Sequence, residues 1–332
     1  MRPLALLKWL LPVFLLVAAC FYSLYGQSPL KLAAGDAWNW LLGREAPDSI
    51  KALTLSARVP RILVALLCGA VLACAGLILQ TLTKNPLASP ALLSLNAGAS
   101  LGVVLTVVLA PALLRSLSLP LAAALGGAFS WGLVMLIASE GRRLQQHRLI
   151  LAGIAVSAFC AALTKTALIL AEDQAVGVLS WLAGGVNGIQ WADLQHYYLF
   201  VLIPIVPLIF LVPKLSLLQL SDDSARSLGL SVENLRRQFN LIVLVWVGAS
   251  VAICGPIAFV GLLTPHLAKF YIGYDLRRTL PMCALLGALI LVSADVLARA
   301  LAFPGELQAG AVLAIIGAPC FVYLAKRRSK DD

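Results

Sequence analysis

The chain is built from long stretches without a single charged residue. Runs free of Asp, Glu, Lys and Arg follow one another at 9–30, 62–83, 85–114, 116–139, 149–164, 174–192, 194–213, 238–268, 279–294 and 307–325. A helix needs about 20 apolar residues to cross the hydrocarbon core of a bilayer, so most of these runs are long enough to span a membrane. We therefore expect an all-α, polytopic membrane protein with about ten transmembrane helices, forming a single domain over residues 1–332.

The composition supports this expectation. Of the 332 residues, 61% are hydrophobic and 12% are charged, and the mean hydropathy is +0.94. A soluble domain carries about 25% charged residues. The composition therefore excludes an ordinary cytosolic enzyme, a disordered chain and a fibrous protein. The formal net charge is +10, but it does not imply nucleic-acid binding, because Lys and Arg are the topology signal of membrane proteins.

Three runs are expected to be interrupted. Run 85–114 contains three prolines, so its first part is expected to be a bend. Run 238–268 contains a Gly-Pro and a Thr-Pro pair and is expected to hold one span, a break and a short second span. The glycine-rich run 174–192 is expected to form a short helix and turn at the membrane face.

The distribution of positive charge predicts the orientation. With the N-terminus inside and about ten spans, most of the 25 Lys and Arg residues fall on the inner side, so both termini are expected in the cytoplasm. An alternative is that residues 1–20 are removed, because Val17-Ala18-Ala19-Cys20 resembles a lipoprotein cleavage box. The aromatic residues that follow, Phe21-Tyr22, favour a continuing span instead.

The sequence lacks the familiar motifs of an enzyme. It has no G-x-x-x-x-G-K-[ST] loop for ATP and no H-E-x-x-H metal motif, and its three histidines are far apart. The seven cysteines lie in apolar runs without metal-ligand spacing, so we expect no metal site, no cofactor and no disulfide framework. A transporter, a channel or a membrane scaffold remains.

One polar inner segment stands out, residues 214–237. Ser221 followed by two aspartates predicts the start of a short helix, and Gly229 predicts its end. Ser231 then predicts the start of a second helix that runs into the next span. We expect these helices to form a docking surface on the cytoplasmic face; the alternative is a solvated loop.

Six motifs follow one another in the sequence: R-V-P-R (58–61), G-A-V-L-A-C-A-G-L-I-L-Q-T-L-T-K-N-P-L-A-S-P (69–90), L-G-L-S (228–231), G-P-I-A-F-V-G-L-L-T-P-H (255–266), A-D-V-L-A-R (294–299) and G-A-V-L-A-I-I-G-A-P (310–319). Together they resemble one family, the permeases of ABC importers for iron-siderophores, haem and vitamin B12. The resemblance extends from about residue 55 to 325. Residues 149–160, 168–175 and 181–186 look most like a permease subunit of a ferric dicitrate importer.

The resemblance implies a bacterial inner-membrane protein that carries ferric citrate from periplasm to cytoplasm. It implies a second permease, here a different sister chain, two cytoplasmic ATPase subunits and a periplasmic binding protein as partners, with the lipid bilayer around them. ATP hydrolysis would occur in the partner. The ATPase would dock on the segment at about 218–237, and the implied coupling residues are Leu218, Ser221, Asp222, Ala225, Leu228, Gly229 and Leu230.

The resemblance also assigns Arg58, Arg61 and Arg299 to docking of the binding protein. They lie at the outer ends of two predicted spans, and a guanidinium group pairs well with the carboxylates of a partner. The alternative is that these arginines anchor the chain at the membrane interface.

Lys165 is a cation inside an otherwise apolar span, where a charge costs about 3 kcal/mol on insertion scales. The resemblance places this span beside the transport path, and a cation there suits an anionic iron chelate. Alternatively, Lys165 extends to the outer face, where Glu172 is positioned to pair with it.

Two alternatives in function remain. The same importer class also serves other siderophores, haem and vitamin B12. A stand-alone secondary transporter is more remote, because acidic residues lie near the ends of the runs, with Asp295 the single candidate at the outer end of a span.

Overall fold

The computed structural model describes residues 3–26, 34–44, 49–109, 118–140, 143–144, 146–170, 175–303 and 305–328. Over these residues the chain is almost entirely helical. The elements are α1 (Pro3–Tyr25), α2 (Ala34–Leu41), α3 (Ile50–Leu82), α4 (Leu95–Val104), the π-helix η1 (Leu105–Leu109), α5 (Leu119–Ala138), β1 (Ser139–Glu140), β2 (Arg143–Leu144), α6 (Gln146–Ile169), α7 (Ala175–Leu182), α8 (Trp191–Leu217), α9 (Asp222–Ser227), α10 (Val232–Cys254), α11 (Val260–Ile272), α12 (Leu276–Ala302) and α13 (Ala309–Arg328).

The lengths of these helices fit a membrane protein. Among the described residues, seven helices are long and apolar enough to cross a membrane: α1, α3, α5, α6, α8, α10 and α12. Two shorter apolar helices extend over Leu95–Val108 and Ala309–Val322, and α11 adds 13 residues. The predicted all-α, polytopic architecture is confirmed.

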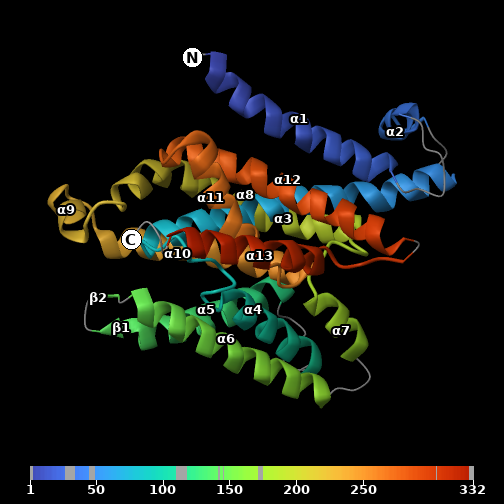
Figure 1. The fold of residues 1–332 in the computed structure, drawn as a ribbon. Helices are drawn as coiled ribbons and strands as arrows, with labels where there is room; N and C mark the ends of the chain where they lie inside the picture. Colours follow the sequence, from blue (N-terminus) through green and yellow to red (C-terminus); the bar gives the residue numbers. More distant parts are fainter. Residues whose placement is uncertain are drawn as a thin grey trace.

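The helix α3 forms the centre of the molecule. It contacts α1, α8, α10, α11 and α12, and α4, α5 and α6 pack as a second group beside it (Figure 1). In its most apolar window, 72% of α3 is buried inside the chain, against 11% for α1. α3 is therefore a core element, whereas α1 lies at the periphery.

Glycines allow α3 to approach its neighbours closely. A Cβ atom on Gly69 would overlap the backbone of Gly287 on α12, and one on Gly76 would overlap the backbone of Gly261 on α11. Such small residues permit the backbone contacts that hold helices together in lipid, where the hydrophobic effect does not drive helix association.

The predicted interruptions are present. The segment between α3 and α4 is a chain of turns, in which the Asn85 side chain accepts a hydrogen bond from the Leu87 N–H at 2.9 Å. α10 ends at Gly255, whose φ is +68°, and α11 starts after Phe259, whose φ is +66°. The expected short helix in run 174–192 is α7.

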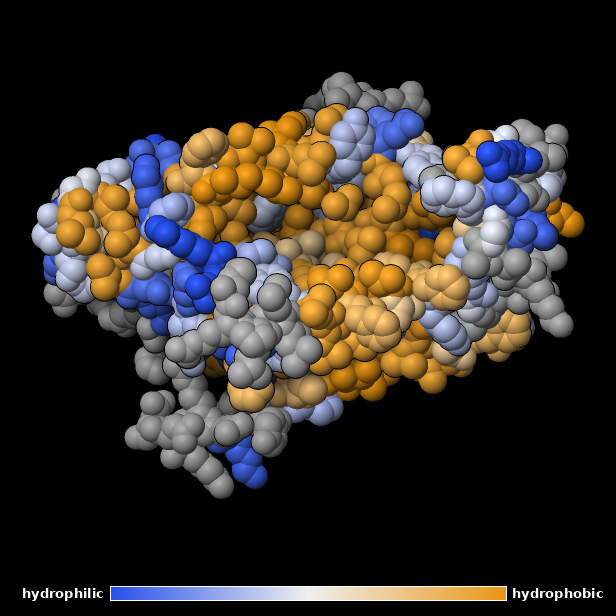
Figure 2. Space-filling view, turned by 90° about the horizontal axis from the view of Figure 1, so that it is seen from above, coloured by the Kyte–Doolittle hydropathy of each residue, from blue (hydrophilic) through white to orange (hydrophobic). Residues whose placement is uncertain are grey.

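The surface between the two ends of the helices is apolar. Figure 2 shows hydrophobic residues across the middle of the molecule and hydrophilic residues gathered toward its two ends. Large apolar side chains such as Phe14, Leu136, Ile203 and Phe210 are exposed on this surface. In a bilayer these side chains contact lipid rather than water.

Candidate functional site

The polar segment between α8 and α10 folds as the sequence predicts. The Ser221 side chain accepts a hydrogen bond from the Ser224 N–H at 3.1 Å and forms the N-terminal cap of α9. Asp222 and Asp223 occupy the first turn, where carboxylates interact favourably with the helix dipole. The second helix, α10, begins directly after Ser231, so both predicted helix starts are confirmed.

Gly229 ends α9 as predicted. Its φ is +80°, and its N–H donates a hydrogen bond to the Arg226 carbonyl at 2.9 Å. The Leu230 N–H reaches the Ala225 carbonyl at 3.3 Å, which completes a Schellman motif. No atom lies within 4 Å of a Cβ added to Gly229. Glycine is therefore required here for its backbone conformation and not for lack of space.

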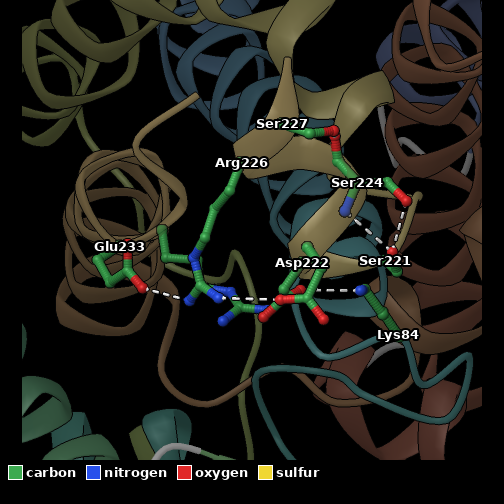
Figure 3. Close-up of polar contacts among 9 residues, drawn as sticks. Lys84, Ser221, Asp222, Ser224, Arg226, Ser227 and Glu233 are labelled. Carbon is green, nitrogen blue, oxygen red and sulfur yellow. Dashed lines mark hydrogen bonds and ion pairs between the residues drawn. The ribbon is translucent and has the colours of Figure 1, made fainter. Parts of the chain in front are cut away.

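Two cations from other elements hold α9 in place through Asp222 (Figure 3). Lys84, just beyond the end of α3, lies 2.9 Å from Asp222 Oδ1, and Arg236 on α10 lies 3.1 Å from Oδ2. A third ion pair, Arg226 to Glu233 at 2.6 Å, joins α9 to the first turn of α10. The segment is therefore a folded helix that three ion pairs connect to its neighbours.

The electrostatics agree with this geometry. Partial burial by itself raises the pKa of the Asp222 carboxyl, but the hydrogen bond from Lys84 and the charges of Arg236 and Lys84 outweigh it. The pKa of Asp222 therefore lies below its ordinary value, and the carboxylate is charged at neutral pH.

The implied coupling residues divide into an exposed and a buried set. Leu228 is 60% exposed, and Gly229 and Ser221 are also open to solvent. Leu218 and Ala225 are buried, and Leu230 packs partly against the core. The exposed set can contact a partner directly, whereas the buried set fixes the position of α9.

The three arginines assigned to docking come together at the opposite end of the molecule. Arg58, Arg61 and Arg299 line one pocket of about 950 Å³, together with Trp191 and Glu306. The structure therefore brings together residues that are up to 241 positions apart in the sequence.

Each of these arginines also has partners inside the chain. Arg58 Nη1 donates to the carbonyl oxygens of Leu24 and Gly26, at 2.6 and 3.0 Å, and Arg299 Nη2 donates to Ser23 Oγ at 2.6 Å. Both contacts fix the last turn of α1, where positive charge is favourable.

Arg61 is held by two carboxylates that the sequence did not assign to this site. Its Nη2 atom lies 2.8 Å from Asp295 Oδ1, and its Nη1 atom lies 3.0 Å from Glu306 Oε1. Asp295 also lies 3.3 Å from Arg299. The pairing of Asp295 with Arg299 could have been predicted from the sequence, because the two residues are four positions apart on one helix. No sequence pattern indicated the contact of Asp295 with Arg61.

Lys165 lies on the exposed side of α6, one turn before the helix ends, and lines a pocket between α4 and α6. Glu172, its expected alternative partner, falls outside the described residues.

Known proteins are similar to this chain over almost its whole length. Residues 14–327 match the FecCD transport family. The chain is 49% identical to the Fe(3+) dicitrate transport system permease protein FecC of Escherichia coli K12, over 97% of each chain. It is 40% identical to FecD of the same organism and system, over 81% of this chain and 84% of the relative.

A solved structure shares the fold. It is described as a metal-chelate type ABC transporter in an inward-facing conformation, and it superposes with a TM-score of 0.78 and 27% identity over 97% of this chain and 99% of the other. The family match, the near full-length relatives and the shared fold confirm the resemblance found in the motifs. The chain belongs to the FecCD transport family.

Proposed function

We propose that this chain is the membrane-spanning permease subunit of a binding-protein-dependent ABC importer that carries ferric citrate, iron(III) dicitrate, from periplasm to cytoplasm. The observation that carries the proposal is the similarity to a permease named for that substrate, which is 49% identical over 97% of each chain. Residues 1–332 act as one permease domain in an inner membrane, with the segment at about 218–237 as its cytoplasmic coupling surface.

The folded α9 surface supports docking of an ATPase partner. Leu228 and Leu220 present apolar side chains at the edge of a polar, ion-paired segment, a mixture that suits a protein interface. The chain has no P-loop of its own, so ATP is bound and hydrolysed in two partner subunits, one beneath each permease.

The arrangement of the helices supports the cytoplasmic placement of both termini. The start of α1 and the end of α13 lie at the same end of the molecule as α9 (Figure 1). Cations such as Lys84, Arg236 and Arg277 also belong to segments at this end, in agreement with an inner-side excess of Lys and Arg.

The pocket at the opposite end is proposed to receive the periplasmic binding protein. Three guanidinium groups face two carboxylates there, so a net positive charge remains to attract an acidic side chain of the partner. The second permease is proposed to be a sister chain, because the related system contains two different permease proteins, FecC and FecD.

Two alternatives are kept. The same architecture serves another siderophore, haem or vitamin B12 if the pathway and the binding protein select that ligand. A stand-alone secondary transporter is disfavoured by Asp295, because this buried carboxylate is already paired with two arginines and is not available to a coupling cation.

Proteoliposomes that contain this chain, its sister permease and two ATPase subunits test the proposal. With binding protein and ATP present, we expect uptake of radiolabelled ferric citrate that stops when ATP is withheld. Uptake of haem or another chelate in place of ferric citrate selects the alternative. Hydrolysis of ATP by the purified chain alone contradicts the assignment of the ATPase to a partner.

Docking is tested with Arg58→Glu, because reversal of Arg61 or Arg299 also removes a counter-charge from buried Asp295. The variant should weaken binding of the binding protein by at least about tenfold, and binding by the unmodified complex should weaken with salt. Arg44→Glu is the control, since Arg44 follows α2, is exposed and does not line the pocket. If both variants have equal affinity for the binding protein, Arg58 does not take part in docking and only anchors the chain at the membrane interface.

A further inference from the structure

A long apolar groove lies between α3, α8 and α12, with α10 at its floor. It has a volume of about 610 Å³. On α8 its wall extends from Val201 to Pro213, and Ile209 within this wall is 63% exposed. The groove is therefore open to the apolar surface of the molecule. We call it the α8–α12 groove.

The interior of the α8–α12 groove suits hydrocarbon. Trp246 at its floor is 2% exposed, and its indole N–H donates to the Val201 carbonyl at 3.0 Å. The Cys74 thiol on α3 donates to a carbonyl of α12 at 3.6 Å. The space is left by small side chains, Ala70 and Cys74 on α3 and Ala284 on α12. A polar solute would lose its hydration here without gaining hydrogen bonds.

The dimensions of the α8–α12 groove fit a lipid chain better than a helix. Val201 and Pro213 are about 18 Å apart along α8 at 1.5 Å per residue, which matches the hydrocarbon thickness of one leaflet, about 15 Å. Dividing 610 Å³ by this length gives a mean cross-section of about 34 Å². A helix about 10 Å across with its side chains needs about 80 Å².

Positive charge lies at one end of the α8–α12 groove, where α12 begins and α8 leads into α9. Of the described residues that line the groove, Arg277 alone is charged. Its side chain is exposed, and none of the ion pairs among the described residues includes it, since Asp275 pairs with Arg278 at 3.7 Å. Lys214 follows Pro213 on the last turn of α8. The cations therefore stand at the mouth of an apolar channel.

Aromatic residues place this end at the level of the lipid headgroups. Tyr274, three residues before Arg277, is 77% exposed, and Phe270 on α11 is 89% exposed. Tyrosine is enriched at the interface between membrane and water. In the proposed orientation this interface is the cytoplasmic one, where anionic lipids attract Lys and Arg.

We infer that the α8–α12 groove binds one anionic phospholipid of the inner leaflet. An acyl chain lies along α8 from Pro213 toward Val201, and the phosphate lies against Arg277, with Lys214 on the same side. A guanidinium group pairs well with phosphate oxygens, and basic sites between spans on the cytoplasmic side bind anionic headgroups. The site shares no residue with the α9 surface or with the pocket of the three arginines.

The headgroup is tested with the assembled importer in mild detergent, by native mass spectrometry during lipid titration. Phosphatidylglycerol and phosphatidylcholine with the same acyl chains are compared. The unmodified complex should bind phosphatidylglycerol about fivefold more tightly, and Arg277→Gln should abolish this preference. Arg278→Gln is the matched control, because Arg278 is 69% exposed and does not line the groove. Equal binding of the two lipids by the unmodified complex, or equal effects of the two substitutions, overturns the inference.

The acyl chain is tested by filling the α8–α12 groove. Ala284→Phe should weaken binding of both lipids at least about fivefold, because a bulky ring occupies the space of the chain. Ala300→Phe is the control, since Ala300 is exposed on the same helix and does not line the groove. Glycerol 3-phosphate should not displace the lipid; displacement shows a simple anion site and overturns the inference. If a helix of the second permease fills the groove, the unmodified complex retains neither lipid, which also overturns it.

A stability measurement keeps the inference testable if Ala284→Phe does not assemble. A ligand that binds the folded state raises the unfolding midpoint, so phosphatidylglycerol should raise the midpoint of the unmodified complex and of Arg278→Gln more than that of Arg277→Gln. Equal shifts in all three contradict a phosphate contact at Arg277. These measurements need no iron chelate, so a failure of ferric citrate uptake leaves their outcome unchanged.

Discussion

Arg61 on α3 and Asp295 on α12 form an ion pair that is almost completely shielded from solvent. The Arg61 Nη2 and Asp295 Oδ1 atoms are 2.8 Å apart, and the Asp295 side chain is 2% exposed. Because Arg299 also lies 3.3 Å from Asp295, a single buried carboxylate balances two guanidinium groups within the chain.

Removing this carboxylate should destabilise the protein. Asp295→Asn leaves two arginines without their buried counter-charge, and the expected loss is about 3–5 kcal/mol, measured as thermal or denaturant unfolding in detergent. Glu306→Gln is the matched change on a side chain that is 50% exposed, and it should cost under about 1 kcal/mol. A similar loss in both variants contradicts the central role of Asp295.

The attachment of α9 should depend on Asp222 and not on its neighbour. Asp222→Asn removes the charge that holds Lys84 and Arg236, so ATP hydrolysis should rise relative to uptake as the surface loosens, with about 0.2–1 kcal/mol of stability lost per pair. Asp223→Asn, on an exposed side chain with one long contact of 3.4 Å, should leave the ratio unchanged. If the ratio of ATP hydrolysis to uptake is equal in the two variants, the ion pairs of Asp222 do not hold α9 in its working position.

The pH dependence of this attachment has a defined sign. The pKa of Asp222 is depressed below its reference value of 3.8, so its contribution is fully present above that value and is lost as the pH falls through the lower folded-state pKa. Coupling of hydrolysis to uptake should therefore not change near neutral pH on account of Asp222.

Gly229 should tolerate asparagine but not valine. A β-branched residue is strained at the positive φ of this position, by about 1–2 kcal/mol or more, whereas asparagine adopts this conformation more readily. Gly229→Val should uncouple hydrolysis from uptake, and Gly229→Asn should largely preserve coupling. Since the position is open to solvent, an equal defect in both variants points to direct contact with a partner instead.

The close contact between α3 and α11 should not accept a methyl group. Gly76→Ala forces a Cβ into the backbone of Gly261, and overpacking of this kind costs about 1–3 kcal/mol or more. Gly132→Ala on α5 is the control, because no atom lies within 4 Å of its added Cβ. Thermal unfolding of the two variants in detergent compares them, and an unchanged midpoint for Gly76→Ala refutes the contact.

Local chemistry in the sequence was enough to predict much of this fold. Proline and glycine marked the breaks around Pro86 and Gly255, and Ser221 and Gly229 marked the two ends of α9, because caps and turns depend on neighbouring residues. Contacts between distant residues left no such pattern. The Lys84–Asp222 ion pair joins residues 138 positions apart, and Asp295 was identified as a lone acid rather than as a partner of Arg61.

The pocket between α4 and α6 illustrates the same limit. Asn96, Ser100 and Ser157 were visible as polar residues within apolar runs, but polar residues in a span also bond to their own helix, as Thr164 does with the Cys160 carbonyl at 2.8 Å. Only the packing of two helices distinguishes a hydroxyl that lacks a partner from one that has it.

The continuity of α3 has a mechanical consequence. Its 33 residues form one rod about 50 Å long, with Arg58 near one end and, just beyond the other, Lys84 in contact with α9. The close contacts at Gly69 and Gly76 lie in the half of α3 that ends near Lys84. No side chains separate the helix backbones there, so these contacts are a natural pivot. A tilt of about 5° over half this length displaces an end by about 2 Å. A tilt of this helix about its tightly packed glycines would therefore displace Arg58 and Lys84 at the same time.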